Sequence, residues 1–442
     1  MTRDALPSTS RTAPPGVPRE LVSRAARDPL AFLLRITREY GDVAQFPTAF
    51  GPLYLVNHPE YVRAVLHSST SVRVSMLKMG LGEGLLTSEG SYWRSQRRRM
   101  QPAFHQQCME SFASIISDTT KELLQQWEPA ADSGDVIDVA AEMNRLTLRI
   151  IGKALFGVDF APVAEKLSTA ITTMLAHLKQ LSFFAPSNTI SGSRQRLFQK
   201  GMKTIDDVVY GIIAERRKGE ERRDFLGLLL DADGAQNVLS DRQVRDEVVT
   251  MFIAGHETTA NMLAWTWYLL ARHPEVERRL YREIDGLLAG RMPGFQDVPK
   301  LPYTKMVIQE SMRIYPPVVL LYRKVFADRE FGGFFIPSGS TIAVSPYTTH
   351  RHPDFWEDAE RFDPERFTPE RHANRPHYAY FPFGGGPHLC MGNVFAMMEG
   401  AVILSAIAAR YSLRLEPGEP VEPDPFITLR LRSGLRMSLE RR

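Results

Sequence analysis

The chain has 442 residues, of which 43% are hydrophobic, 24% charged and 10% aromatic. This composition excludes a disordered or fibrous protein, and the length is sufficient to bury a large core. The formal net charge of +3 is too small for a nucleic-acid binder that relies on bulk positive charge, so we expect no nucleic-acid partner.

The N-terminal stretch, MTRDALPSTSRTAPPGVPRE, is rich in Pro, Ser and Thr and contains no apolar signal-peptide core. We expect residues 1–18 to be disordered, with no membrane anchor. Because no internal repeat or linker divides the rest, we expect one domain over residues 19–442. The two cysteines, Cys108 and Cys390, could form at most one disulfide, which fits a reducing compartment and predicts a cytoplasmic protein.

Most of the chain predicts helices, with short strands between some of them. Residues 42–57 are predicted to form strands with turns, and residues 74–91 are glycine-rich and predict an irregular, mobile loop. Apolar residues recur with helical spacing in five stretches of the first half: residues 28–41, 58–69, 92–104, 115–155 and 163–217.

The short predicted helix over residues 92–104 contains Trp93 and Arg97 in the spacing W-x-x-x-R. Taken alone, Arg97 indicates an exposed basic helix, because Arg94, Arg98 and Arg99 surround it.

A much longer helix is predicted to begin at Ser240, where Gln243 completes a capping box, and to continue to Arg272. At about 1.5 Å per residue it would be about 50 Å long, enough to cross a whole domain. Its apolar run is interrupted by polar residues that include Glu257, and a carboxylate at the centre of a bilayer is costly. A buried core helix is therefore predicted rather than a membrane span.

The middle of this helix reads AGHETT, residues 254–259. Gly255 weakens a helix by about 1 kcal/mol relative to Ala, so we expect it to have a compensating use. A zinc-protease motif is excluded because its second histidine would stand where the chain has Ala260. An accidental polar patch in a core helix is the alternative interpretation.

Two further patterns lie in the second half of the chain. Glu310 and Arg313 are three residues apart and could pair on one helix face, although this spacing occurs often by chance. The stretch FGGFFIPSGSTIAVSP predicts a strand, a turn and a second strand, and residues 426–442 resemble a β-hairpin.

Cys390 lies in the loop FPFGGGPHLCMG, residues 381–392, just before an apolar run that predicts a helix. A helix N-terminus would lower the pKa of its thiol, and residues 384–386, all glycine, would let backbone N–H groups approach the sulfur. A lone cysteine in a glycine loop is more often structural, so the surrounding spacing has to distinguish a structural cysteine from a ligand.

The spacing around Cys390 matches F-x-x-G-x-[R/H]-x-C-x-G at Phe383, Gly386, His388, Cys390 and Gly392. It resembles the haem-ligand loop of the cytochrome P450 family. The AGHETT segment is similar to that family's oxygen-binding motif at five positions: Ala254, Gly255, Glu257, Thr258 and Thr259. With the tryptophan–arginine and glutamate–arginine patterns in family order, the resemblance covers about residues 20–442.

The resemblance implies a mainly α, triangular single domain with a small β-rich lobe. Haem b would lie between the long distal helix and the helix after Cys390, whose thiolate would bind the iron. The family pattern assigns four residues to the haem propionates: Trp93, Arg97, Arg323 and His388, the last standing where many members have Arg. Five more would shape the cofactor site: Ala254, Gly255, Phe383, Gly386 and Gly392. Arg366 of FDPERF would join Glu310 and Arg313 in a buried charge network with a structural role.

The resemblance also implies a monooxygenase that inserts one oxygen atom from O2 into a lipophilic small molecule, such as a terpenoid, steroid, fatty acid or polyketide. Thr258 would bond to bound oxygen and Glu257 would relay protons. Segments expected to line the substrate pocket are residues 74–86, 171–187, 317–320 and 426–429.

The same resemblance implies a monomer of bacterial type, serving natural-product biosynthesis. Electrons would come from NAD(P)H through a separate reductase and a ferredoxin or flavodoxin, which could dock on Arg98 and Arg99. A haem-thiolate isomerase or dehydratase, which needs no electron donor, and a non-catalytic haem sensor are the alternatives.

Overall fold

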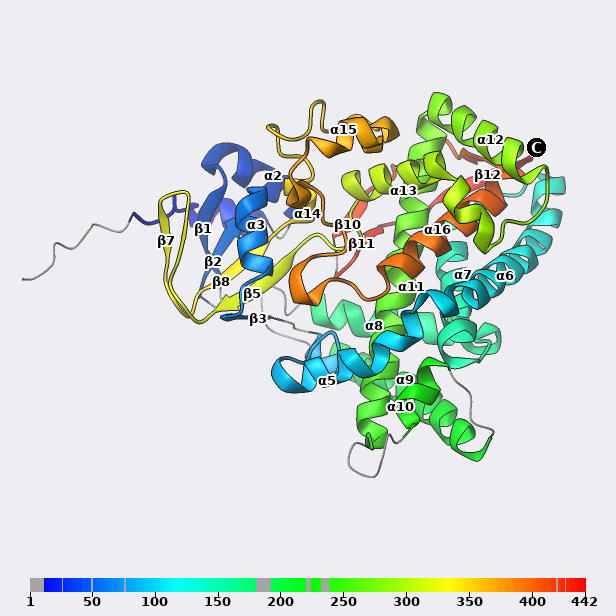
Figure 1. Cartoon of the computed structure of the whole chain (residues 1–442), viewed down its shortest axis with the longest axis horizontal. Coiled ribbons are helices and arrows are strands. Elements are labelled where there is room, and N and C mark those ends of the chain that lie inside the picture. Colours follow the sequence, from blue (N-terminus) through cyan, green and yellow to red (C-terminus); the bar gives the residue numbers. More distant parts are fainter. Residues whose placement is uncertain are drawn as a thin grey trace, which may run out of the picture.

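The computed structural model describes residues 12–25, 27–48, 51–74, 77–179, 192–219, 224–231, 238–418, 420–425 and 427–442. Its helices gather on the broad side of the molecule in Figure 1, and most strands lie on the narrow side. The α-helices of these residues are α1 (Arg19–Arg24), α2 (Pro29–Tyr40), α3 (Pro59–Leu66), α4 (Lys78–Leu81), α5 (Gly90–Met100), α6 (Gln106–Ser133), α7 (Val139–Ile151), α8 (Ala164–Lys179), α9 (Gly192–Lys218), α10 (Phe225–Leu230), α11 (Asp241–Arg272), α12 (Pro274–Leu288), α13 (Pro302–Ile314), α14 (Pro346–Thr349), α15 (Pro369–Ala373) and α16 (Asn393–Ala408).

The strands are short and form several small sheets rather than one large one. The largest sheet has the order β1-β2-β8-β5-β3, in which β2 and β8 run parallel. The strands are β1 (Val43–Thr48), β2 (Gly51–Val56), β3 (Ser71–Arg73), β4 (Ile137–Asp138), β5 (Leu321–Val325), β6 (Arg329–Phe331), β7 (Phe334–Ile336), β8 (Thr341–Val344), β9 (Tyr411–Leu415), β10 (Pro423–Pro425), β11 (Leu429–Leu431) and β12 (Arg436–Arg441).

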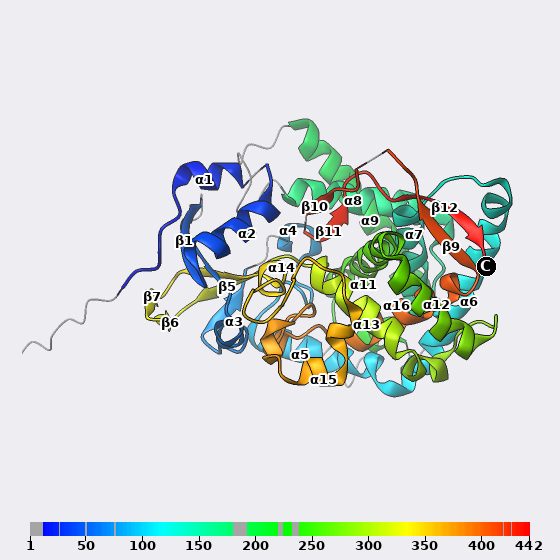
Figure 2. The ribbon, with the colours of Figure 1, turned by 90° about the horizontal axis from the view of Figure 1, so that it is seen from above.

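Helix α11 forms the centre of the molecule, as predicted. Ser240 Oγ accepts a hydrogen bond from Gln243 N (3.3 Å), and Ser240 N donates to Gln243 Oε1 (2.9 Å), so the expected capping box is present. Pro274 begins the next helix directly after His273. Between these ends, side chains on all faces of α11 are buried, which is typical of a helix surrounded by protein. Figure 2 shows it enclosed by its neighbours.

The segment before α1 differs from the expectation of disorder up to residue 18. Residues 1–11 lie outside the described part of the chain, but residues 12–18 run along the β-rich lobe. Val17 is buried, and its N–H donates to Gln45 O (2.8 Å). Thr12 O accepts from Phe335 N (2.8 Å) at the far edge of the lobe. Strand edges therefore order this Pro-rich stretch despite its composition.

The predicted irregular loop over residues 74–91 contains helix α4 and is fastened to α11. Asp246 Oδ2 accepts from Glu83 N (2.9 Å), and Glu247 Oε2 accepts from Leu85 N (2.7 Å). Residues 75 and 76 lie outside the described residues. The expectation of a mobile loop is thus wrong for residues 83–85, because buried carboxyl groups of α11 accept hydrogen bonds from the backbone there.

The predicted C-terminal hairpin is also wrong. Strand β11 pairs with β10, whereas β12 pairs with β9 and with β4. Strands β11 and β12 both exist, but they do not pair with each other. Each pairs with other strands, so the turn between them does not form a hairpin.

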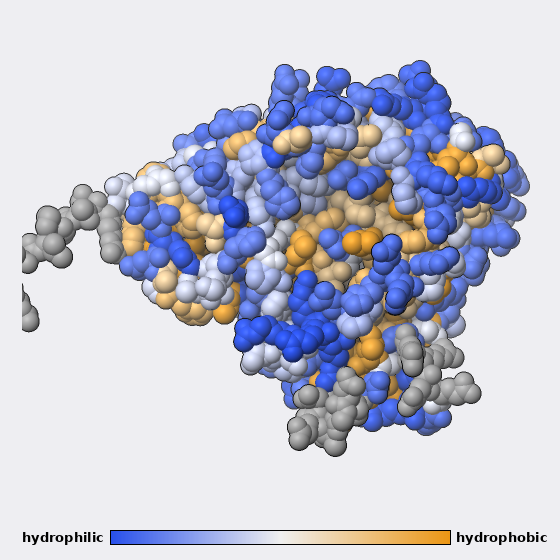
Figure 3. Space-filling model, viewed as in Figure 1, coloured by the Kyte–Doolittle hydropathy of each residue, from blue (hydrophilic) through white to orange (hydrophobic). Residues whose placement is uncertain are grey.

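The molecule tapers from the helical side to the β-rich lobe, giving a roughly triangular outline (Figures 1 and 3). The stretch FGGFFIPSGSTIAVSP, which was predicted to form a strand, a turn and a second strand, contains the end of β6 and the whole of β7 and β8. Within the described chain, no helix is both long and apolar enough to cross a membrane. The mainly α fold with a small β-rich lobe is confirmed.

Candidate active site

The loop before α16 is shaped by glycines that allow close approach. Gly384 and Gly386 have positive φ values of 72° and 65°, which favour glycine. A side chain at Gly386 would collide with Leu66 O, and one at Gly385 would collide with Tyr378. Gly386 N donates to the Tyr378 hydroxyl (3.2 Å), so this part of the loop is packed against α3 and its neighbours.

Cys390 lies at the end of this loop, and its N–H donates to Phe383 O (3.0 Å). Its thiol opens into an internal cavity but is surrounded by protein atoms. Burial raises the pKa of the thiol, against the smaller lowering effects of the Gly392 N–H and the positive charge of Arg97. The expected lowered pKa is therefore wrong for the protein alone, and the N–H that acts on the sulfur belongs to Gly392.

The cavity that Cys390 faces has a volume of about 730 Å³. It lies between α11 and the loop before α16 and is the place where most of the predicted site residues meet. Ten of them line it: Trp93, Arg97, Ala254, Gly255, Thr258, Arg323, Phe383, His388, Cys390 and Gly392. The other two, Gly386 and Glu257, lie behind its wall.

The α11 wall of the cavity is formed by the AGHETT segment. Thr258 faces the cavity, and its hydroxyl donates to Ala254 O (2.7 Å). Gly255 has a second use that the sequence did not indicate: a Cβ there would lie 2.7 Å from Ile151 Cδ1 of α7. The glycine therefore allows α7 to pack closely against α11, and it also leaves open space in the cavity that it lines.

Glu257 is a buried carboxyl beside that wall. Its Oε1 accepts from the Thr428 hydroxyl (2.9 Å), while its Oε2 has no hydrogen-bond partner among the described residues. Burial raises the pKa of Glu257, although the Thr428 hydrogen bond and the charge of Arg430 oppose the shift. A buried carboxyl of this kind can hold and release a proton.

The opposite edge of the cavity is strongly cationic. Arg97 Nη1 donates to Leu389 O (3.0 Å), which fixes α5 against the cysteine loop. The rings of Trp93 and His388 lie with centroids 4.1 Å apart. His388 Nε2 is buried and lies 3.4 Å from Glu89 Oε2, but the geometry of this contact is not that of a hydrogen bond.

Sequence reasoning missed two members of this cluster, Arg73 and Glu89. Arg73 of β3 stands directly opposite Arg323 of β5, a like-charge pair that destabilises a sheet unless an anion is near. Burial and then the charge of Arg73 lower the pKa of Arg323 to about 10. Glu89 Oε1 accepts from Arg73 Nε (2.6 Å). Burial would raise the pKa of Glu89, but contacts with His388 and Arg73 outweigh it and lower the pKa to about 2.

Burial lowers the pKa of His388, so the positive charge here comes from Arg73, Arg97 and Arg323. One carboxylate does not balance three arginines, so this edge is suited to further anionic groups.

The rest of the cavity wall is apolar. The four predicted lining segments all contribute described residues: Val74, Leu77, Leu85, Leu86, Leu178, Pro317, Val318, Val319, Leu320, Ile427 and Thr428. The parts of these segments at residues 75–76, 180–187 and 426 lie outside the described residues. Further apolar lining residues, which the sequence did not assign to the cavity, lie in segments predicted to be helical: Leu33, Ile151, Leu155, Met251 and Ile253. The cavity is therefore suited to a lipophilic molecule.

The predicted glutamate–arginine triad lies in the core outside the cavity wall. Glu310 Oε2 is 2.6 Å from Arg313 Nε, and its Oε1 is 3.3 Å from Arg366 Nε. Arg313 also donates to the backbone carbonyls of His350, Ala359 and Arg361. This network fastens α13 to the long segment that leads to the cysteine loop.

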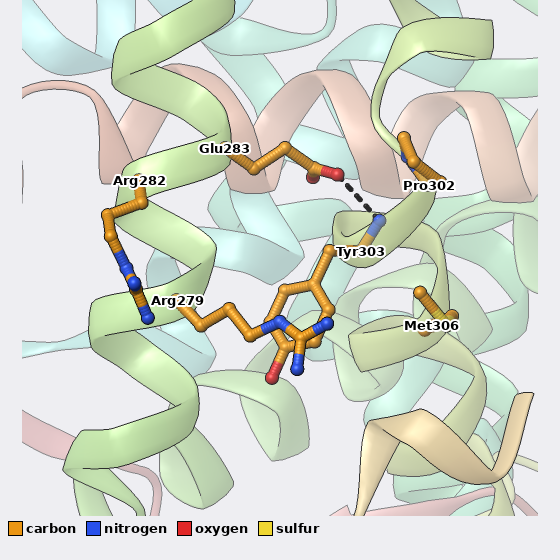
Figure 4. Close-up of a pocket in the computed structure, with 6 residues that line it drawn as sticks. All are labelled: Arg279, Arg282, Glu283, Pro302, Tyr303 and Met306. Atoms are coloured by element: carbon orange, nitrogen blue, oxygen red, sulfur yellow. Dashed lines mark hydrogen bonds between the residues drawn. The ribbon is translucent and has the colours of Figure 1, made fainter. Parts of the chain in front are cut away.

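A second hollow, between α12 and α13, is lined by Arg279, Arg282, Glu283, Pro302, Tyr303 and Met306 (Figure 4). Glu283 accepts from Tyr303 N (2.7 Å) at the start of α13, and the Arg279 guanidinium stacks over the Tyr303 ring and pairs with Glu365. These groups hold the two helices together. The hollow is open to the surface and lies apart from Cys390.

Comparison with known proteins agrees with this geometry. The cytochrome P450 family model matches residues 21–435, almost the whole chain. The chain belongs to the cytochrome P450 family.

Two bacterial relatives match this chain over more than nine-tenths of their own length. Cyclooctat-9-en-7-ol 5-monooxygenase of Streptomyces melanosporofaciens is 36% identical over 93% of this chain and 91% of its own. Pentalenene oxygenase of Streptomyces avermitilis is 32% identical over 98% and 97%. The crystal structure of the cytochrome P450 CYP102L1 superimposes with a TM-score of 0.87 at 26% identity, covering 98% of this chain and 100% of that one.

The protein is thus a cytochrome P450 monooxygenase, with the expected fold and enzyme class confirmed. The family binds haem iron through a cysteine thiolate, and this cavity fits that cofactor. Its cationic edge has one carboxylate, Glu89, against three arginines, and haem would bring two propionates. The Cys390 thiol faces the open space of the cavity. Coordination to iron deprotonates a thiol even where burial raises its pKa.

Proposed function

We propose that this P450 hydroxylates a terpenoid, with haem b bound through the Cys390 thiolate. The observation that supports this most strongly is the cavity itself: a cysteine opposite Thr258, across an apolar space with cations at one edge. The two Streptomyces relatives are named for cyclooctat-9-en-7-ol and pentalenene, both terpenoids with little polar surface.

The cofactor residues have distinct parts in this proposal. Arg97, Arg323 and His388, joined by Arg73, would neutralise the two propionates, and Trp93 would pack beside His388. Phe383 and the glycines of the loop would hold the thiolate, while Ala254 and Gly255 leave room on the distal side.

Thr258 and Glu257 would manage protons on the distal side. Thr258 has a hydroxyl at the cavity wall, and Glu257 is a carboxyl whose burial favours the protonated form. Haem supplies the oxygen-activating chemistry when bound, and these residues would supply the protons that it consumes.

Electrons would come from NAD(P)H through a ferredoxin or flavodoxin and its reductase. The face beside Cys390 suits such a partner. Arg94 and Arg98 are exposed on α5, which Arg97 joins to the cysteine loop at Leu389, and Leu389 and Val394 are exposed on either side of Cys390. Figure 3 shows hydrophilic residues over α5 next to apolar residues near the start of α16. Arg99 is half-buried and less available than expected.

An optical titration of the haem-loaded ferric protein tests the substrate class. Pentalenene, cyclooctat-9-en-7-ol, a steroid and a long-chain fatty acid would each be added while the Soret band is followed. We expect the two terpenoids to displace iron-bound water and shift the band from low to high spin, and the fatty acid to have no effect.

Turnover of the best ligand with a surrogate ferredoxin, its reductase, NADPH and O2 should then give a singly hydroxylated product. A shift caused only by the steroid or the fatty acid would overturn the terpenoid proposal. A protein without any Soret band after haem supplementation would overturn the assignment of Cys390.

A further inference from the structure

One face of α11 holds the segment just before β11. Glu257, Asn261 and Trp265 are spaced by four residues and lie above one another on that face. Thr428 Oγ1 donates to Glu257 Oε1 (2.9 Å) and accepts from Asn261 Nδ2 (3.1 Å). Trp265 Nε1 donates to Leu429 O (2.9 Å) on the next turn. Three consecutive turns of the helix thus fix two adjacent residues of the C-terminal region.

The order of these hydrogen bonds sets the direction of the Thr428 hydroxyl. An amide NH2 group only donates, so the Thr428 oxygen accepts from Asn261 and its single proton points to Glu257. All three side chains are buried, and Leu429 N donates to Pro317 O (2.8 Å), so Thr428 is held from its other side as well.

Thr428 is also the member of this chain of hydrogen bonds that reaches the cavity. It lines the cavity with Thr258, whereas Glu257 and Asn261 do not. Because Oε1 of Glu257 is occupied by Thr428, Oε2 is the oxygen left without a partner among the described residues.

We propose that Thr428 is a positioning residue for Glu257: its hydroxyl, oriented by Asn261, anchors Oε1 and leaves Oε2 to take up and release the proton. This inference rests on the proposed proton-relay role of Glu257. Glu257 gains one proton at Oε2 and passes that proton on, so the carboxylate is restored and no oxidant or reductant is involved.

The electrostatics of the site agree with such a role. The charged group that acts on Glu257 from the neighbouring strand is Arg430, which itself pairs with Asp424 (3.0 Å). Burial raises the pKa of Glu257, and the Thr428 hydroxyl limits that rise. Loss of the hydroxyl should therefore favour the protonated carboxyl and free both of its oxygens to rotate.

Infrared spectroscopy of the ferric holoenzyme tests the anchor without any substrate. The C=O stretch of the protonated carboxyl is assigned by its loss in Glu257→Gln and followed against pH. We expect Thr428→Val to move this band to higher wavenumber and its titration to higher pH, and Thr428→Ser to restore both. Thr266→Val is the matched control, because within the described chain the buried Thr266 hydroxyl donates to Met262 O on the same helix and to no other group.

Coupling of NADPH consumption to product, measured with a surrogate ferredoxin, gives the functional result. We expect a loss of about tenfold in Thr428→Val, recovery in Thr428→Ser and no loss in Thr266→Val. If Thr428→Val does not bind haem, Thr428→Ala removes the same hydroxyl and should give the same shift.

An unchanged carboxyl band in Thr428→Val would overturn the positioning role. So would equal coupling losses in the Thr428 and Thr266 variants. A wild-type protein that forms no oxygenated product, with the band shifts still present, would overturn the proposed function and leave the anchor in place.

Discussion

Glu247 is a second buried carboxyl of α11, and its environment makes stability depend on pH. It is fully buried, and burial raises its pKa to about 8, with a smaller raising effect from Asp246 and an opposing one from the Leu85 N–H. An unfolded glutamate titrates near its ordinary value of 4.5. Between these values the folded protein binds one more proton than the unfolded chain, so stability falls as the pH rises through this window.

We therefore predict that Glu247→Gln becomes progressively more stable than wild type between pH 5 and pH 8. The expected change is a few kcal/mol, at about 1.4 kcal/mol per pH unit, measured by urea unfolding. Glu110→Gln on the exposed face of α6 is the control and should show no such trend. A constant difference between Glu247→Gln and wild type would mean that Glu247 is already ionised in the folded protein.

Single residues show which kinds of neighbour a sequence pattern can indicate. Cys390, Thr258 and Arg97 were predicted because each lies in a motif with fixed spacing. Arg73 belongs to no motif and reaches the site through strand pairing. Thr428 lies in a segment that was expected to line the cavity, but no pattern indicated its hydrogen bond to Glu257. Such neighbours become visible only when distant segments are brought together.

At the scale of elements, the contact between α7 and α11 depends on Gly255. A methyl group there would lie 2.7 Å and 2.9 Å from Ile151 Cδ1 and Cγ1. Alanine would improve helix propensity by up to about 1 kcal/mol, whereas overpacking costs about 1–3 kcal/mol, so the overpacking should prevail.

We predict that Gly255→Ala lowers the free energy of unfolding by about 1 kcal/mol and that adding Ile151→Val recovers part of the loss. Gly286→Ala on α12 is the matched control: no atom lies within 4 Å of its Cβ position, so it should gain about 0.5–1 kcal/mol. Urea unfolding of Gly255→Ala, Ile151→Val, the double variant and Gly286→Ala checks this. Additive effects of the Gly255 and Ile151 changes would contradict direct contact.

The elements themselves were predictable where local signals agreed. The capping box, apolar spacing and Pro274 located α11 almost to the residue. The hairpin at the C-terminus failed because β12 pairs with β4 and β9, partners that no local turn specifies. The loop over residues 74–91 failed because its backbone donors bind Asp246 and Glu247, which lie about 160 residues later.

For the whole molecule, charge next to the cysteine loop should control electron delivery. We predict that Arg94→Glu with Arg98→Glu slows reduction by an acidic ferredoxin about tenfold at low salt, without changing ligand-induced spin shifts. Stopped-flow reduction at several ionic strengths measures this effect.

The matched control is Arg278→Glu with Arg282→Glu, which makes the same change of charge on exposed residues of α12. This helix lies across the molecule from α5 (Figure 1), so its variant should be reduced at the wild-type rate. Equal slowing in both double variants would indicate an effect of net charge rather than docking on α5.

The parallel pairing of β2 with β8 also determines when the β-rich lobe can form during synthesis. Strand β2 ends at Val56 and β8 begins at Thr341, and ribosomes add roughly 5–20 residues per second, so the partner emerges roughly 15 s to a minute later. During that delay β1 and β2 have an unpaired strand edge, the kind of surface that chaperones bind and that aggregates. The lobe is thus completed late on the ribosome, after most of the helical core has been made.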